Sequence, residues 1–95
     1  MIISPERIAQ IERRHADLAA QMGNPSLAAD KFVQLSKDYA ELSPVVEAAA
    51  ALRTLREEAT DLKAIPADDE MYDMAQEELR DIEAKLPEAE RAMAL

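Results

Sequence analysis

Apolar side chains recur along this chain at intervals of three and four residues, in three segments separated by turn-forming residues. This spacing places them on one face of an α-helix, which has about 3.6 residues per turn. The first segment has its apolar positions at Ile8, Ile11, Leu18 and Met22. Ser4 is a favourable N-cap, and Pro5 suits the first helical position. With Gly23 as a natural stop, the pattern predicts a helix from about Pro5 to Met22.

A second, longer segment is predicted to begin between Ser26 and Ala29. Its apolar positions are Phe32, Leu35, Tyr39, Leu42, Val46, Ala49, Leu52, Leu55, Ala59 and Leu62. Pro44 interrupts this segment, and a proline inside a helix costs about 3 kcal/mol. The apolar pattern nevertheless keeps its phase across the proline, which favours one long helix kinked at Pro44. The alternative is a true break, with Ser43 capping a new helix.

The third segment follows a turn at residues 65–67, with Asp68 or Asp69 as the predicted N-cap. Its apolar positions are Met71, Ala75, Leu79, Ile82, Leu86, Ala89 and Met93. Pro87 falls inside this pattern, so we expect either a second kink there or a helix end near Leu86.

The composition supports an all-α fold. Aromatic residues, which favour strands, are scarce: the chain has one phenylalanine, two tyrosines and no tryptophan, and it has one glycine. We therefore expect residues 1–95 to form a single helical domain, a three-helix antiparallel bundle or a bent helical hairpin, with the two long helices kinked near Pro44 and Pro87. The first helix is the shortest, so one flank of the long pair should stay open to another domain or a partner.

The net charge of −9 is concentrated at the C-terminal end. From Pro66 onward there are ten acidic and three basic residues, a net charge of −7 in the last third of the chain. A surface this acidic repels phosphate backbones, which argues against sequence-independent binding of nucleic acid. It is either a solvated helix face or a surface that meets a basic protein or orients the domain on a charged particle.

The basic residues Arg13, Arg14, Arg53 and Arg56 occur in two close pairs and are the candidate partner-binding residues. We expect these arginines to form ion pairs with Glu12, Asp17 and Glu57 or with the acidic third helix. The alternative is that they contact ribose-phosphate.

The residues needed for catalysis or metal binding are scarce. His15 is the only histidine, and its place beside the apolar face predicts a packed neighbour of the core. There is no cysteine, so a thiolate metal site is impossible. Asp73 and Glu77 share a helix face, but no Glu-x-x-His motif accompanies them. The sequence therefore predicts no cofactor, no metal site and no enzymatic activity in this chain.

Two ordered motifs stand out in this chain. The first is LSK-x-Y-x-x-L-x-P-V-V, which occupies Leu35, Ser36, Lys37, Tyr39, Leu42, Pro44, Val45 and Val46. The second is MA-x-EEL, beginning at Met74. In this order they resemble the motifs of the N-terminal helical domain of the bacterial class I peptide chain release factors. The resemblance covers nearly the whole chain and is greater to the type that reads UAA and UAG.

The resemblance implies a cytoplasmic protein that acts in translation termination. The family hydrolyses peptidyl-tRNA with a Gly-Gly-Gln motif and reads the codon with a Pro-x-Thr type motif, and neither occurs here. We therefore expect a non-catalytic N-terminal fragment of a longer factor. Its implied partners are the ribosome, including protein and RNA of the large-subunit stalk base, and the factor's remaining domains, with no membrane and no DNA.

Two other hypotheses remain open on the sequence. One is a free-standing helical adaptor or coiled-coil interaction protein. The other is a small metal-carboxylate bundle enzyme.

Overall fold

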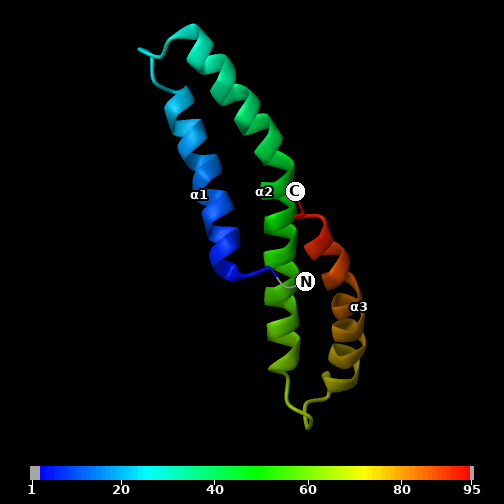
Figure 1. The fold of residues 1–95 in the computed structure, drawn as a ribbon. Coiled ribbons are helices and arrows are strands. Elements are labelled where there is room, and N and C mark those ends of the chain that lie inside the picture. Colours follow the sequence, from blue (N-terminus) through cyan, green and yellow to red (C-terminus); the bar gives the residue numbers. More distant parts are fainter. Residues whose placement is uncertain (1–2, 95) are drawn as a thin grey trace.

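The computed structural model describes residues 3–94, which form three helices and no strands in that range (Figure 1). These are α1 (Pro5–Met22), α2 (Ala29–Lys63) and α3 (Tyr72–Arg91). The all-α prediction is confirmed, and α1 has the predicted bounds. Its start is fixed by Ser4, whose side-chain oxygen accepts a hydrogen bond from the Arg7 N–H at 3.1 Å.

Helix α2 runs unbroken through Pro44, so the predicted alternative of a break at this point is wrong. Ser43 does not cap a new helix, because its hydroxyl donates a hydrogen bond to the Tyr39 carbonyl oxygen at 2.8 Å within the same helix. The ribbon bends near its middle, so that the first half of α2 inclines toward α1 (Figure 1). A bend there is expected, because Pro44 supplies no N–H for the Ala40 carbonyl.

Helix α3 begins later than the sequence indicates. The predicted caps Asp68 and Asp69 lie in a turn before the helix, and α3 starts at Tyr72. The reason is local, since Asp69 Oδ1 accepts a hydrogen bond from the Met71 N–H at 2.8 Å and so stabilises the turn. The helix then continues through Pro87 to Arg91, which rules out the predicted alternative of an end near Leu86.

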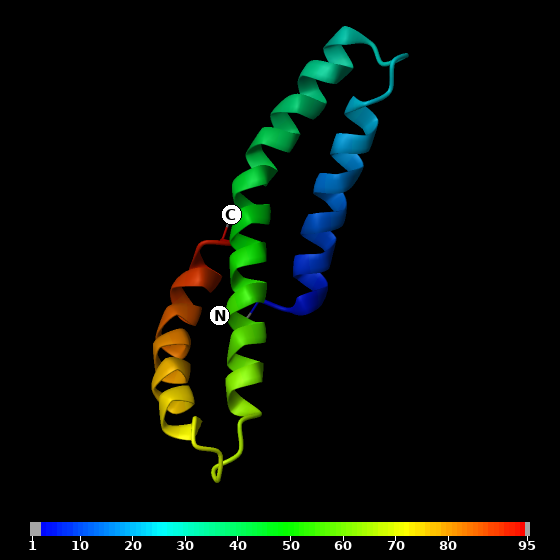
Figure 2. The same ribbon diagram turned by 180° about the vertical axis from the view of Figure 1, so that it is seen from behind.

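Helices α1 and α3 both run antiparallel to α2 but lie on opposite sides of it (Figures 1 and 2). Each packs against α2, and the two do not pack against each other. The apolar face of α2 explains this arrangement. From Leu35 to Leu62 is 27 residues, about seven and a half turns, so on a regular helix these leucines point in opposite directions. The result is an extended domain of 62 × 22 × 18 Å.

The core is centred at the middle of α2, where the start of α1 and the residues just after α3 pack against it. This central cluster consists of Ile8, Ile11, Val45, Ala49, Leu52 and Met93. A second cluster of Ala59, Leu79 and Ile82 joins α2 to α3. Two residues of the predicted apolar faces stay outside the core, because Phe32 is 45% exposed and Met71 is 47% exposed.

Between residues 3 and 94, no helix is both long and apolar enough to cross a lipid bilayer.

Candidate functional site

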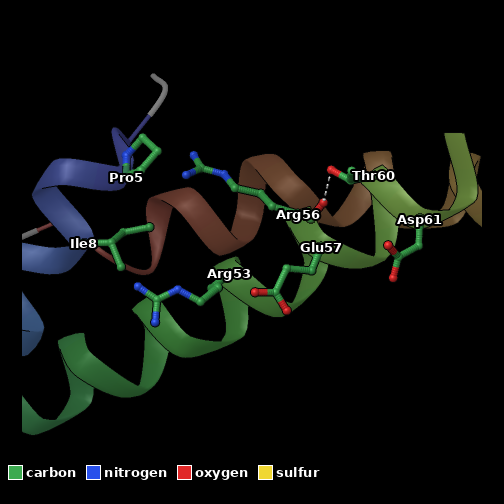
Figure 3. A pocket seen from close by; sticks show the side chains of 7 residues that line it. All are labelled: Pro5, Ile8, Arg53, Arg56, Glu57, Thr60 and Asp61. Carbon is green, nitrogen blue, oxygen red and sulfur yellow. Dashed lines mark hydrogen bonds between the residues drawn. The ribbon is translucent and has the colours of Figure 1, made fainter. Parts of the chain in front are cut away.

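The structure divides the four candidate arginines between two places. Arg53 and Arg56 lie on α2 opposite the start of α1, where they help to line a pocket of about 280 Å³. Figure 3 shows this pocket, whose lining residues are Pro5, Ile8, Arg53, Arg56, Glu57, Thr60 and Asp61. The pocket is positioned by packing, because Ile8 belongs to the central cluster that fixes α1 against α2.

Arg53 bridges α2 to α1 through a two-pronged contact with Glu12. Its Nη1 donates to Oε2 at 2.9 Å and its Nη2 to Oε1 at 2.5 Å. Glu12 was predicted as an acidic partner, whereas its pairing with an arginine of another helix was not predicted. The two side chains are 46% and 31% exposed, so solvent screens the pair and limits its contribution to about 1 kcal/mol or less. Its geometry nevertheless restricts how α1 slides along α2.

Arg56 is half-buried, and its guanidinium extends toward Pro5 (Figure 3). Its backbone carbonyl accepts a hydrogen bond from the Thr60 hydroxyl at 3.0 Å. Among residues 3–94 the Arg53–Glu12 contact is the one ion pair. The predicted ion pairs of the other three arginines are therefore not formed within this part of the chain.

Arg13 and Arg14 are exposed on α1, away from the pocket. Arg13 follows the buried Ile11 by two residues, a rotation of about 200°, which places it on the side of α1 opposite α2. The four arginines therefore do not form one basic patch. The pocket itself is balanced in charge, because Glu57 and Asp61 stand beside Arg53 and Arg56. Such a lining does not select an anion.

His15 packs between helices, as the sequence predicts. It is half-buried, and its ring stacks on Tyr39 of α2 with centroids 4.2 Å apart and planes inclined by 20°. Its Nε2 lies 3.0 Å from the Ser43 hydroxyl oxygen. This contact between His15 and Ser43 was not predicted from the sequence. It could have been suspected from the spacing of Tyr39 and Ser43, which are four residues apart and therefore share one face of α2.

The His15–Ser43 contact is not a nucleophile and its base. The single hydroxyl proton of Ser43 is already donated to the Tyr39 carbonyl, so Ser43 accepts and His15 Nε2 donates. A general base would need the opposite direction, with an unprotonated Nε2 accepting from the serine. The contact therefore holds α1 against the bend in α2. Across residues 3–94, no three potential ligands are grouped to hold a metal ion.

The arrangement described so far is that of an all-α domain of three helices, and the sequence comparisons identify its family. Residues 11–95 match the PCRF domain, so the chain belongs to the PCRF domain family. No solved structure matches.

The sequence is also similar to proteins named peptide chain release factor 1. Identity is 47% to that of Erythrobacter litoralis over 95 residues, which cover all of this chain and 27% of the relative. It is 45% to that of Zymomonas mobilis, over 98% of this chain and 26% of the relative. It is 42% to that of Novosphingobium aromaticivorans, over all of this chain and 27% of the relative. The chain thus spans about a quarter of the length of these relatives, and the resemblance stated from the two motifs is confirmed.

Proposed function

We propose that this chain is the non-catalytic N-terminal module of a cytoplasmic peptide chain release factor. In translation termination it helps to position the factor on the ribosome. The observation that carries the proposal is the match to the PCRF domain over residues 11–95, together with 47% identity to a release factor 1 over the whole chain. The chain corresponds to about a quarter of such a factor and contains neither a Gly-Gly-Gln nor a Pro-x-Thr motif, so the proposal assigns peptidyl-tRNA hydrolysis and codon reading to the factor's other domains.

The residues of the longer motif support a structural role for it. Leu35 and Val45 are buried in the domain, and Leu42 and Val46 pack against the central cluster. Tyr39 stacks on His15, and Pro44 lies at the bend of α2. Each of these side chains or backbone features sets the shape of the domain, and none of them forms part of a reactive group.

The shape and charge support a role in positioning. An extended domain with its helices packed on both sides of α2 can act as a spacer between a factor and a distant ribosomal surface. We propose that this surface is the stalk base of the large subunit, with its protein and RNA. The acidic character disfavours wrapping around RNA, while the exposed Arg13 and Arg14 can make local phosphate contacts.

A peptide-release assay tests whether this chain by itself lacks release activity and codon specificity. Ribosomes carrying peptidyl-tRNA with UAA in the A site are mixed with the 95-residue chain, and released peptide is measured against a full-length release factor 1. The expected result is release at the rate of ribosomes alone, with no difference between UAA and a sense codon. Release above that background from this chain would refute the proposal.

A further inference from the structure

A shallow groove of about 150 Å³ lies between α2 and α3, toward the hairpin that joins them. Its lining residues are Glu58, Asp61, Leu62, Glu78 and Ile82. Ile82 is buried and Leu62 is half-buried, so the floor is apolar, whereas the three acidic residues are exposed around it. The groove thus combines an apolar base with three carboxylates and no basic residue.

Within the described part of the domain, no ion pair neutralises the carboxylates of this groove. Residues 3–94 contain one ion pair, and it lies elsewhere, between Arg53 and Glu12. The three carboxylates are also not grouped as metal ligands in these residues. The cation that suits such a groove is therefore one that brings its own apolar surface, because the floor must be covered as well as the charge matched.

One helical turn before Glu78, α3 carries an exposed apolar side chain. Met74 precedes Glu78 by four residues and therefore lies on the same flank of the helix. Its side chain is 63% exposed, and Met71, just before the helix, is 47% exposed. Methionine side chains are flexible and polarizable, so they adapt to different apolar partners.

We propose that this groove binds a basic amphipathic helix of a protein partner. A lysine or arginine of the partner lays its aliphatic stem on Leu62 and Met74 and places its charged head among the carboxylates of Glu58, Asp61 and Glu78. Apolar residues on the same face of the partner helix cover Met71 and Met74. RNA is disfavoured, because its phosphates carry the same sign of charge as the rim. The inference rests on the surface alone and holds whether or not the domain acts on the ribosome.

A binding experiment with a defined probe tests this. The probe is a fluorescein-labelled synthetic peptide that forms an amphipathic helix of leucine and lysine, measured by fluorescence anisotropy at 0.1 M salt. The groove variant carries Glu58→Gln and Glu78→Gln. The control carries Glu41→Gln and Glu47→Gln, two exposed positions elsewhere on α2, and changes the net charge by the same amount.

The groove variant should weaken peptide binding by about fivefold to tenfold, since each exposed ion pair contributes a modest amount. The control should weaken it by less than about twofold, and Met74→Gln should weaken it by about threefold or more without changing the net charge. Circular dichroism is expected to show unchanged helix content in all variants. Equal weakening by the two double variants would overturn the proposal, because it would show attraction by net charge alone.

Two further measurements use the unmodified chain. Methyl NMR shifts on adding the peptide should concentrate at Leu62, Met74 and Ile82, and shifts confined to the α1–α2 end would contradict the assignment. A labelled single-stranded RNA oligonucleotide should bind at least tenfold more weakly than the peptide. RNA binding of equal strength would overturn the choice of a basic protein segment.

Discussion

Replacing Leu52 by alanine should weaken the domain more than any exposed substitution. Leu52 is 0% exposed and belongs to the central cluster, where residues of α1, α2 and the end of the chain meet. Leucine-to-alanine changes at buried sites cost about 2.7 to 5.0 kcal/mol, and the cost rises with the cavity that remains. We expect about 3 to 4 kcal/mol, because the neighbouring side chains come from three segments and cannot all close the gap together.

That loss is large for this domain. At about 0.05 to 0.15 kcal/mol per residue, a chain of 95 residues has a total stability of about 5 to 14 kcal/mol. The variant should therefore remain folded in buffer but unfold at much lower denaturant concentration. Since Leu52 contacts a cluster that includes Ile8 and Met93, hydrogen exchange should accelerate in both α1 and α3.

Urea unfolding followed by circular dichroism at 25 °C measures the effect, with Met74→Ala as the control. Met74 is 63% exposed, so its replacement should cost less than about 0.5 kcal/mol. The slope of free energy against urea should be the same in both variants, because the folded shape is kept. A loss below about 1 kcal/mol for Leu52→Ala would mean that the central cluster does not hold the three segments together.

Three further substitutions test the contacts between α1 and α2 and the bend. Pro44→Ala restores a helix N–H at an exposed position, so urea unfolding should show unchanged or higher stability, and a loss above about 0.5 kcal/mol would contradict a continuous α2. Arg53→Met removes the ion pair with Glu12 and should lower the free energy of unfolding by about 1 kcal/mol or less. This loss should shrink in 1 M NaCl, because salt screens exposed charges, and an undiminished loss there would exclude an electrostatic origin. Ser43→Ala leaves the Nε2–H of His15 without its acceptor and should cost about 1 kcal/mol, whereas no change in the unfolding midpoint would show that this hydrogen bond does not hold α1.

Much of the fold could be predicted because the helix boundaries are encoded locally. Ser4, Pro5 and Gly23 define α1 by capping chemistry alone, and the phase of the apolar residues around Pro44 distinguished a continuous helix from a break. The start of α3 was predicted wrongly because an aspartate before a helix is typical both of an N-cap and of a turn. An aspartate such as Asp69 can cap a helix or close a turn.

The arrangement of the helices could not be read from periodicity. The pattern identifies an apolar face but not whether another helix covers it, which is why Phe32 was assigned to the packed face and is exposed. Nor did the pattern show that α1 and α3 take opposite sides of α2. The apolar face of α2 rotates gradually between Leu35 and Leu62, which is consistent with partners on opposite sides. That α1 and α3 occupy those two sides is known only from the structure.

The candidate site was predictable only in part. Glu12 was predicted as an acidic partner of the arginines, but its pairing with Arg53 across two helices was not predicted, because it depends on how α1 lies against α2. The groove at Glu58 and Glu78 was not predicted, because it depends on the register between α2 and α3. Single helices specify which residues share a face, whereas a groove needs two faces placed beside each other.

The claim that this domain positions a release factor without taking part in its chemistry is tested most directly by release kinetics. A full-length factor that carries the domain is compared with the same factor lacking residues 1–95, on ribosomes with UAA in the A site, over a range of factor concentrations. We expect the maximal release rate to stay within about threefold while the half-saturating factor concentration rises at least tenfold, since a positioning contact acts mainly through binding. A collapse of the maximal rate at saturating factor, with half-saturation unchanged, would contradict it.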